Sequence, residues 1–242
     1  MNFLGFELWE EGVQELLHTV EEAIREGKKL HIVTLNPEMV ARQTFDLSFR
    51  QVLQEAEVLI PDGVGIVWGI RFLERRVLER LAGIELAEEI VVQGEKKGWS
   101  FYFLGGEPGI AEQAARNLCR RYPRLRVVGF HHGYFGEDGE VVEDICGKVP
   151  DVLLVGMGSP RQEKWVHRYK DVLPSWVMIG VGGSLDVWSG KKKRAPRLWQ
   201  TMRLEWGYRL LCEPWRIRRI VPSFLRFAWL LLREKFRKKR MI

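Results

Sequence analysis

The stretch Asp151–Gly183 reads DVLLVGMGSPRQEKWVHRYKDVLPSWVMIGVGG and contains a complete strand–turn–helix–strand unit. Its two apolar runs, Asp151–Val155 and Trp176–Val181, are short and predict strands that are covered on both faces. Residues 160–171 lie between them, follow a glycine-rich turn and have a helical pattern. A strand, a helix and a second strand in this order predict a right-handed crossover between parallel strands.

The same alternation extends outward over the first 190 residues. Four further apolar runs predict strands at Leu30–Thr34, Glu57–Ile60, Ser100–Leu104 and Arg126–Phe130. Helical patterns occur at residues 10–27, 37–54, 64–80, 84–97, 109–121 and 138–147. We therefore predict an α/β protein whose residues 1–190 form a doubly wound, Rossmann-like parallel sheet. A chain of 242 residues suffices for one sizeable core and a small appendage.

The composition changes after about residue 190. Lys191–Ile242 contains 17 Lys and Arg but only three acids, whereas the rest of the chain has 21 basic and 29 acidic residues. From Ser223 onward, arginines lie on one helical face and Phe, Trp and Leu fill much of the rest. We predict a basic, aromatic helical appendage over residues 191–242, interrupted at Pro214 and Pro222. Such a helix suits an anionic membrane surface.

The cysteines and the apolar runs limit the cellular location. The chain has three cysteines, which are widely spaced and form no CxxC pair, so we expect a reducing compartment without disulfides or structural zinc. No signal peptide is evident at the N-terminus, and no apolar run approaches the roughly 20 residues that span a bilayer. These features predict a cytoplasmic protein that is peripheral to the membrane.

Polar residues follow the predicted strands at the edge where α/β proteins bind ligands. Asn36 precedes Pro37 and suits a helix cap, while Thr34 beside it would point into the same crevice. Asp62 lies between Pro61 and Gly63. It is either a turn residue that caps the next helix, or a carboxylate that accepts a proton from an attacking hydroxyl group.

Three further motifs each have two interpretations. The turn at 105–109, with Gly105 and Gly106, is either a phosphate-binding turn before a helix or a plain tight turn. Ser159 and Gln162 fit a capping box, or Gln162 hydrogen-bonds a sugar or base. His131 and His132 are adjacent and lack an evident carboxylate partner, so we expect no metal. No Asp-x-Asp pair is present to hold a divalent ion, and we predict no cofactor.

Seven motifs, in order, resemble the WecG/TagA/CpsF family of bacterial glycosyltransferases. They are Thr-x-Asn-Pro (34–37), Pro-Asp-Gly-x-Gly (61–65), Glu-Arg-x-x-Gly (79–83), Gly-x-Gly-Ser-Pro-x-Gln-Glu-x-Trp (156–165), Gly-Val-Gly-Gly-x-x-Asp (180–186), Arg-Ala-Pro (194–196) and Leu-Glu-Trp-x-x-Arg-Leu-x-x-Glu-Pro-x-Arg (204–216). The resemblance implies an inverting, metal-independent transferase at the inner face of the membrane. A typical member moves N-acetylmannosamine from its UDP donor to undecaprenyl-diphosphate-linked N-acetylglucosamine, in wall teichoic acid or related surface-polymer synthesis.

The resemblance also implies roles for individual residues. Asp62 would be the general base. Substrate-binding residues would be Thr34, Asn36, Arg80, Gly105, Gly106, Gln162, Gly182, Gly183, Arg209, Arg216 and Arg219. The last three would contact a diphosphate as the appendage closes over the active site, and the glycine turns would shape the nucleotide pocket.

Other readings remain open. The donor could be another UDP-hexose, such as UDP-N-acetylmannosaminuronic acid. A nucleic-acid-binding α/β protein is favoured only by the charge of the C-terminal end, so we expect no nucleic-acid partner. A nucleotide-dependent oxidoreductase or methyltransferase lacks support because the dinucleotide-binding fingerprint is missing. The exposed aromatic appendage is also a candidate surface for a homo-oligomer in solution.

Overall fold

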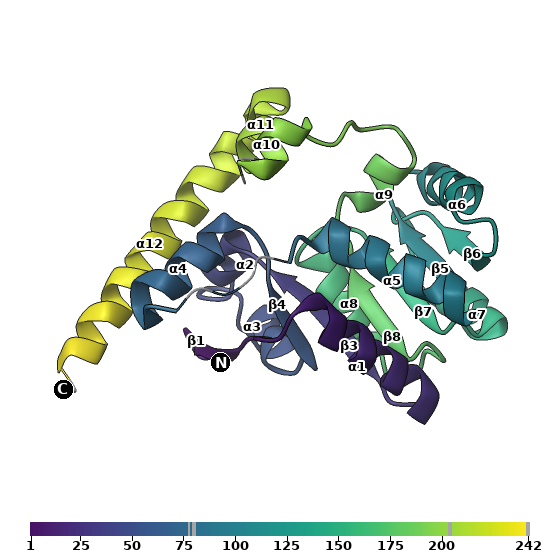
Figure 1. The fold of residues 1–242 in the computed structure, drawn as a ribbon, viewed down its shortest axis with the longest axis horizontal. Helices are drawn as coiled ribbons and strands as arrows, with labels where there is room; N and C mark the ends of the chain where they lie inside the picture. The colour runs from purple at the N-terminus through teal and green to yellow at the C-terminus, as the bar shows by residue number, and fades with distance from the viewer. Residues whose placement is uncertain (77, 79–80, 203–204, 241–242) are drawn as a thin grey trace.

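The computed structural model describes residues 1–76, 78, 81–202 and 205–240, and it confirms the α/β class (Figure 1). Six parallel strands form the main sheet in the order β4-β3-β8-β7-β5-β6. Their bounds are β3 Leu30–Leu35, β4 Val58–Pro61, β5 Ser100–Gly105, β6 Arg126–His131, β7 Val152–Gly156 and β8 Val177–Gly180. All six predicted strands are therefore confirmed to within one residue at each end.

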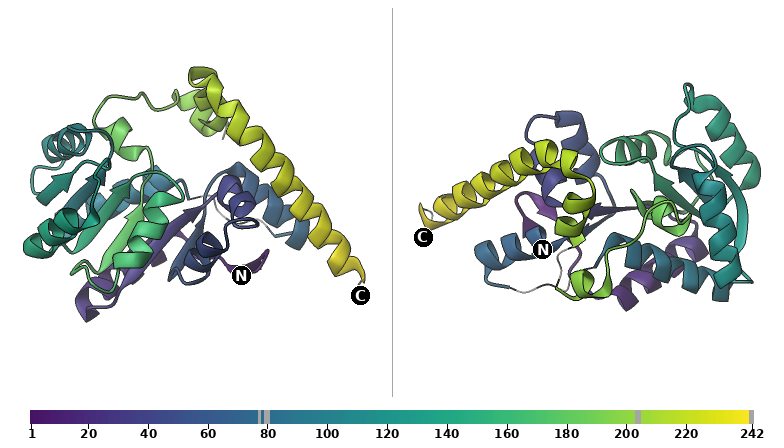
Figure 2. Two further views of the ribbon diagram at one scale, coloured as in Figure 1. Left: turned by 180° about the vertical axis from the view of Figure 1, so that it is seen from behind. Right: turned by 90° about the horizontal axis from the view of Figure 1, so that it is seen from above.

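Helices cover both faces of this sheet, as a doubly wound fold requires (Figures 1 and 2). One face packs on α1 Val13–Glu26, α5 Gly83–Lys97, α6 Ile110–Arg121 and α9 Ser184–Trp188. The other packs on α2 Pro37–Arg42, α3 Leu47–Gln54, α4 Val64–Glu74, α7 Asp138–Lys148 and α8 Arg161–Tyr169. Successive strand residues point to opposite cores: Ile32 of β3 belongs to the first and Val33 to the second.

Local structure differs from the prediction in several places. The helix predicted over residues 64–80 ends earlier, as α4, because Arg75 adopts a left-handed conformation with φ 55°. The single helix predicted over residues 37–54 is divided into α2 and α3, because Asp46 begins a new helix by accepting a hydrogen bond from the Phe49 amide at 3.0 Å. A small hairpin of β1 (Asn2–Phe3) and β2 (Phe6–Glu7) was not predicted, since two-residue strands give no periodic signal.

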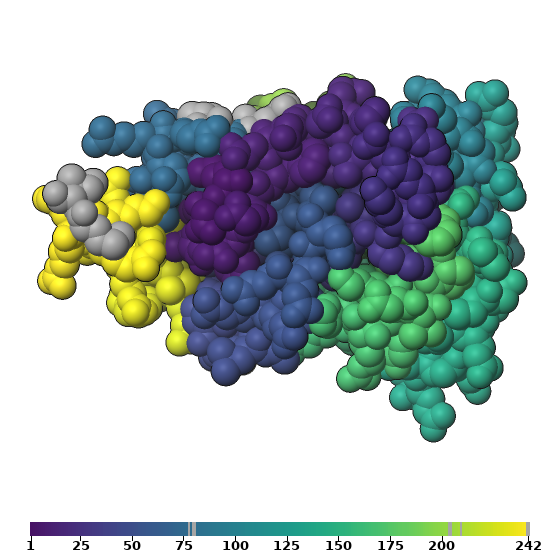
Figure 3. All heavy atoms as spheres, turned by 90° about the horizontal axis from the view of Figure 1, so that it is seen from below, coloured from purple at the N-terminus to yellow at the C-terminus, as the bar shows by residue number. Residues whose placement is uncertain are grey.

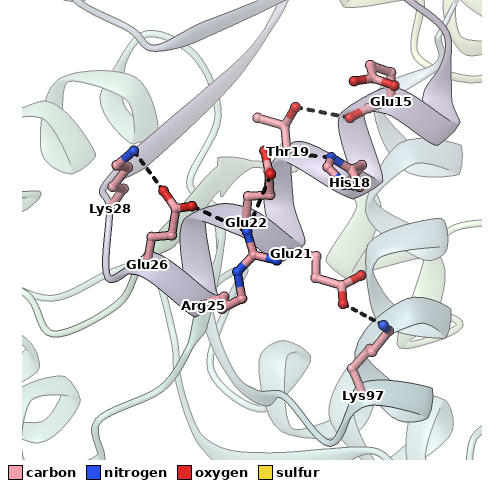
Figure 4. A network of polar contacts seen from close by, with 9 residues as sticks. All are labelled: Glu15, His18, Thr19, Glu21, Glu22, Arg25, Glu26, Lys28 and Lys97. Atoms are coloured by element: carbon pink, nitrogen blue, oxygen red, sulfur yellow. Dashed lines mark hydrogen bonds and ion pairs between the residues drawn. The ribbon is translucent and has the colours of Figure 1, made fainter.

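The outer face of α1 is polar and carries a network of surface ion pairs (Figure 4). Arg25 bridges Glu22 and Glu26, and Lys28 pairs with Glu26 at 2.7 Å. Lys97 reaches from α5 to Glu21 and so links two neighbouring helices. Exposed pairs of this kind contribute little stability, and they keep this face hydrated.

The basic C-terminal end is helical, as predicted, and crosses from α9 to the opposite side of the molecule (Figures 1 and 2). It consists of α10 Arg197–Thr201, α11 Glu205–Cys212, a 3₁₀ turn at Pro214–Arg216 and the long α12 Ile217–Arg240. Arg194 pins its start to the core, since the guanidinium pairs with Glu85 of α5 and with Glu205 of α11.

Helix α12 lies against α2 and α4, and its buried residue Phe227 belongs to the hydrophobic core. Phe227 is buried beside Phe3, with ring centroids 6.5 Å apart, so the N-terminal residues contact α12 (Figure 3). Gly69 of α4 permits the approach: a Cβ there would lie 3.0 Å from Phe227 and 3.1 Å from Leu231. The division of the chain at residue 190 remains a prediction, because α12 and the core helices share these contacts.

The predicted interruption at Pro222 is wrong, because α12 runs through this residue. Proline removes one amide donor and costs a helix about 3 kcal/mol. The carbonyl left without a donor belongs to Arg218, which is an exposed residue. Ile220 and Phe227 are buried on either side of Pro222 and hold the helix in place. Within the described residues, no helix is both long enough and apolar enough to span a membrane.

Candidate active site

A cavity of about 600 Å³ lies beyond the carboxyl ends of β3, β4 and β8, between the core and the appendage. Parallel α/β sheets bind ligands at this edge. Core residues in its lining include Thr34, Asn36, Asp62, Gln162, Gly182 and Gly183. The appendage contributes Glu205, Trp206, Arg216, Arg219, Ile220, Ser223 and Phe224. The cavity thus brings together the predicted base and two of the predicted phosphate-binding arginines.

Asp62 lies directly after β4 at the side of the cavity. Its backbone amide donates to the Leu35 carbonyl at 2.9 Å, which ties the turn to the end of β3. The N-cap of α4 is Gly63, with φ 82°, so Asp62 is not the cap that the alternative interpretation required. A glycine suits position 63 because side chains disfavour positive φ. The half-buried carboxylate of Asp62 borders the cavity.

Thr34 and Asn36 both border the cavity at the end of β3. Asn36 caps α2, since its Oδ1 accepts a hydrogen bond from the Met39 amide at 3.1 Å. The capping interpretation is therefore confirmed, and the same residue lines the cavity. Gly83 packs closely on Thr34: a Cβ at position 83 would lie 3.2 Å from the Thr34 hydroxyl.

Gln162 ties together the turns that follow β7 and β8. Its Oε1 accepts hydrogen bonds from the backbone amides of Gly158 and Gly182, both at 3.1 Å. Its Nε2 donates to Oε1 of Glu163 at 2.7 Å. The capping-box interpretation is wrong, because α8 has Pro160 at its N-cap and Gln162 bonds Gly158 instead. The side chain is buried and borders the cavity.

The appendage arginines lie opposite the core turns. Arg219 of α12 pairs through Nε with Glu38 of α2 at 2.7 Å, and more than half of its side chain is exposed. Arg216 pairs through Nε with Glu213. Arg209 belongs to α11, but the placement of its side chain lies outside what the structure describes, and Arg80 lies outside the described residues altogether.

The two glycine turns have different positions. Gly182 and Gly183 border the cavity, at the start of α9. Gly105 is the last residue of β5, Gly106 follows it, and both are absent from the lining. There Gly105 packs against the backbone of Gly156 so closely that a Cβ would overlap it. The structure therefore gives these two glycines a packing role and does not bring them to the cavity.

Several residues of the cavity lining were not predicted from the sequence. Glu38 and Arg42 are four residues apart on α2, so they lie on one helical face. This spacing could have indicated from the sequence that both face the cavity. Phe45 and Trp206 also line the cavity. The Trp206 ring lies 6.0 Å from that of Phe224, which joins α11 to α12 beside the cavity. No local pattern indicates this aromatic pair, because the contact is made only once α11 folds back.

Within the residues that the structure describes, no three His, Cys, Asp or Glu side chains form a group that could hold a metal ion. The rings of His131 and His132 lie 4.4 Å apart between centroids and are tilted by 41°, and Nδ1 of His131 lies 2.8 Å from the His132 carbonyl oxygen.

A carboxylate beside a sheet crevice, with arginines from basic helices across the cavity, is an arrangement suited to group transfer from an anionic substrate. The sequence model of the Glycosyl transferase WecG/TagA/CpsF family matches residues 1–241, and the chain belongs to that family. It is therefore a glycosyltransferase.

Three curated relatives of this chain carry the same enzyme name. A protein from Bacillus subtilis (strain 168) is 34% identical over 208 residues, which cover 86% of this chain and 81% of that protein. One from Bacillus spizizenii is 32% identical over 210 residues, 86% and 82% of the two chains. A Staphylococcus aureus protein is 37% identical over 199 residues, 81% and 78%. Each is named N-acetylglucosaminyldiphosphoundecaprenol N-acetyl-beta-D-mannosaminyltransferase.

Proposed function

We propose that this glycosyltransferase moves N-acetylmannosamine from UDP-N-acetylmannosamine to undecaprenyl-diphosphate-linked N-acetylglucosamine, in wall teichoic acid or related surface-polysaccharide synthesis. The names of the relatives at 32–37% identity support this acceptor and this sugar. The observation that carries the proposal is the shared cavity of Asp62, Arg216 and Arg219. This cavity holds a carboxylate that can deprotonate the acceptor hydroxyl group and two guanidinium groups that can bind a diphosphate.

Asp62 is the general base of the proposed reaction. Its carboxylate takes the proton from the attacking hydroxyl group of the acceptor sugar. The hydroxyl oxygen forms a bond to the anomeric carbon of the donor, the bond from that carbon to the diphosphate breaks, and UDP leaves with the electron pair. A single displacement from the opposite face inverts the configuration. General-base catalysis of this kind is worth about 10²–10⁴ in rate.

The charge on the departing diphosphate is neutralised by arginine side chains without a metal. Arg219 is held by Glu38 in an exposed ion pair, and such pairs contribute little net stability. A diphosphate, with more charge than one carboxylate, therefore replaces Glu38 at small cost. Arg216 and the backbone amides at the start of α9 line the same cavity and provide further contacts for the diphosphate.

Helix α12 and α4 form the surface that binds the anionic inner face of the cell membrane. The exposed apolar residues of α12 recur every three or four positions along one side, at Val221, Leu225, Trp229, Leu232 and Phe236. Leu231 and Lys235 contact α4 at Gly69 and Phe72, and Trp68 of the same helix is 69% exposed. Arg219 and Arg226, on the opposite flank of α12, contact Glu38 and Phe45. The same apolar face would be covered in a homo-oligomer in solution.

The decisive experiment replaces Asp62 by Asn and measures transfer to a synthetic lipid-diphosphate N-acetylglucosamine. We expect turnover to fall by about 10²–10⁴, because the amide cannot accept the proton, while the protein stays folded. Asp171→Asn, at an exposed position outside the cavity lining, is the matched control and retains full activity. Near-normal turnover by the Asp62→Asn protein would remove this carboxylate from the mechanism.

A panel of UDP-sugars in the same assay identifies the donor. Product mass separates N-acetylmannosamine from its uronic acid and from other hexoses. Transfer of another hexose, with none of N-acetylmannosamine, would contradict the proposed donor while leaving the family and the acceptor intact.

A further inference from the structure

Glu163 is a buried carboxyl group beside the cavity to which the proposed reaction assigns no role. It follows Gln162 in α8, is only 1% exposed, and belongs to the cavity lining. One oxygen, Oε1, accepts the hydrogen bond from Gln162. The other, Oε2, is shielded from solvent and has no hydrogen-bond partner within the described residues.

This environment favours the uncharged acid. Burial raises the pKa of Glu163, and this effect outweighs the opposing influence of the Gln162 amide, the backbone and the Ser159 hydroxyl. A buried carboxylate with one unpaired oxygen would carry a large desolvation cost, which protonation relieves. Oε1 can accept the hydrogen bond from Gln162 in either protonation state.

The orientation of the Gln162 amide follows from its neighbours. Two backbone N–H groups point at Oε1 of Gln162, so the Nε2 end must face Glu163. Gly180 backs this pair: a Cβ there would overlap Nε2 of Gln162 and lie 3.3 Å from Oε1 of Glu163. The side chains of Gln162 and Glu163 are therefore held in place by Gly180 on one side and by their hydrogen bonds on the other.

We propose that Glu163 is a positioning residue, which acts through Gln162 to hold the turns at Gly158 and Gly182 in the shape that receives the sugar nucleotide. Gly158 and Gly182 both line the cavity, and the Oε1 atom of Gln162 links them by accepting a hydrogen bond from each. Without an acceptor at position 163, a buried Nε2 donor is left unsatisfied and the amide reorients. The two turns then lose their common anchor.

The test compares Glu163→Gln with Glu163→Leu, and it rests on the proposed UDP-sugar donor. Glutamine keeps a neutral acceptor for Gln162, whereas leucine fills a similar volume without one. In calorimetric titration with UDP, we expect affinity within about twofold of the parent for Glu163→Gln and about tenfold weaker for Glu163→Leu. In transfer assays the KM for the donor follows the same pattern, and the KM for the lipid acceptor is unchanged.

Stability separates positioning from a general structural role. Leucine leaves the buried Gln162 Nε2 donor unsatisfied, so the Glu163→Leu protein should melt below the parent but remain folded at the temperature of the titration, where its UDP affinity is compared. Arg168→Leu adds the same side chain at an exposed site of α8 and should change neither quantity. UDP affinity unchanged in Glu163→Leu, or equally weak in both variants, would overturn the assignment. Absence of UDP binding by the parent protein would instead overturn the proposed donor, and this assignment with it.

Discussion

Individual side chains at the cavity stabilise the fold and face the substrate region at the same time. Asn36 caps α2, and Gln162 holds two backbone turns. Arg219 joins α12 to α2 through Glu38. Substitution of such residues changes both stability and activity. Asp62 lies just before Gly63, the N-cap of α4, so its substitution leaves that cap residue in place.

His31 of β3 is a residue whose titration should affect stability. It is fully buried, neither ring nitrogen has a hydrogen-bond partner in the described part of the chain, and burial, with the nearby charges of Lys170 and His167, lowers its pKa to about 3. In the unfolded chain His has a pKa of about 6.5. As the pH falls, His31 is therefore protonated in the unfolded chain before it is protonated in the folded protein. The stability that is present above about pH 6.5 is lost as the pH falls toward the pKa of His31 in the folded protein, by at most about 1.4 kcal/mol per pH unit.

Urea unfolding of the parent and of His31→Leu, at neutral pH and at about pH 5, checks this expectation. The variant should lose much less stability on acidification than the parent. His18→Gln, a change at an exposed position of α1, should retain the parental pH dependence. Equal acid sensitivity in the parent and His31→Leu would show that other groups dominate.

At the scale of elements, the sequence allowed prediction wherever the signal was local. Buried strands such as Val152–Gly156 are continuous apolar runs, and both their position and their class could be read directly. Asp46 divides a helical pattern because a cap outweighs periodicity there. Pro222 fails to break α12 because tertiary packing on either side holds the helix.

The candidate site could be predicted only in part, for the same reason. Turns after β3, β4 and β8 point to Asn36, Asp62 and Gly182, since carboxyl ends of parallel strands share one edge. The order of the strands decides which turn stays outside the cavity. Gly105 ends β5, which lies two strands away from β8. The partners of Gln162 come from two different turns, a non-local fact that spacing does not contain.

The docking of α12 leads to a prediction about stability. Phe227 is almost fully buried among core residues, so Phe227→Ala should lower the free energy of unfolding by about 3–5 kcal/mol. Phe236 is on the same helix but is mostly exposed, and Phe236→Ala should change stability by less than about 0.5 kcal/mol. Chemical denaturation of both variants makes the comparison. Similar, small effects would mean that α12 is not docked on the core in solution.

Charge is unevenly distributed over the whole molecule, and the basic residues lie at its C-terminal end. The core is mildly acidic, whereas residues 191–242 are strongly basic. Arg219, Arg226, Arg233, Arg237 and Arg240 lie along one flank of α12, next to the exposed apolar row. Because α11 and α12 also line the cavity, a membrane bound to this surface would lie close to the place where a lipid-linked acceptor must enter.

Membrane binding should therefore need both the apolar row and the positive charge. The double variant Trp229→Ser/Phe236→Ser removes two exposed aromatic side chains, each worth about 1.5–3 kcal/mol when fully buried in an apolar phase. We expect its partitioning onto phosphatidylglycerol vesicles to fall at least about tenfold. Binding of the parent should also weaken at high salt and on phosphatidylcholine vesicles, since anionic headgroups attract the arginines.

Sedimentation of the protein with the vesicles measures both effects. Val172→Ser alters an exposed apolar residue that lies outside α12 and α4, and it should leave vesicle binding unchanged. If the double variant binds as the parent does, the apolar row is not the membrane contact. A parent protein that sediments as a larger species without vesicles, and a double variant that does not, would instead assign the row to contact between copies of this chain.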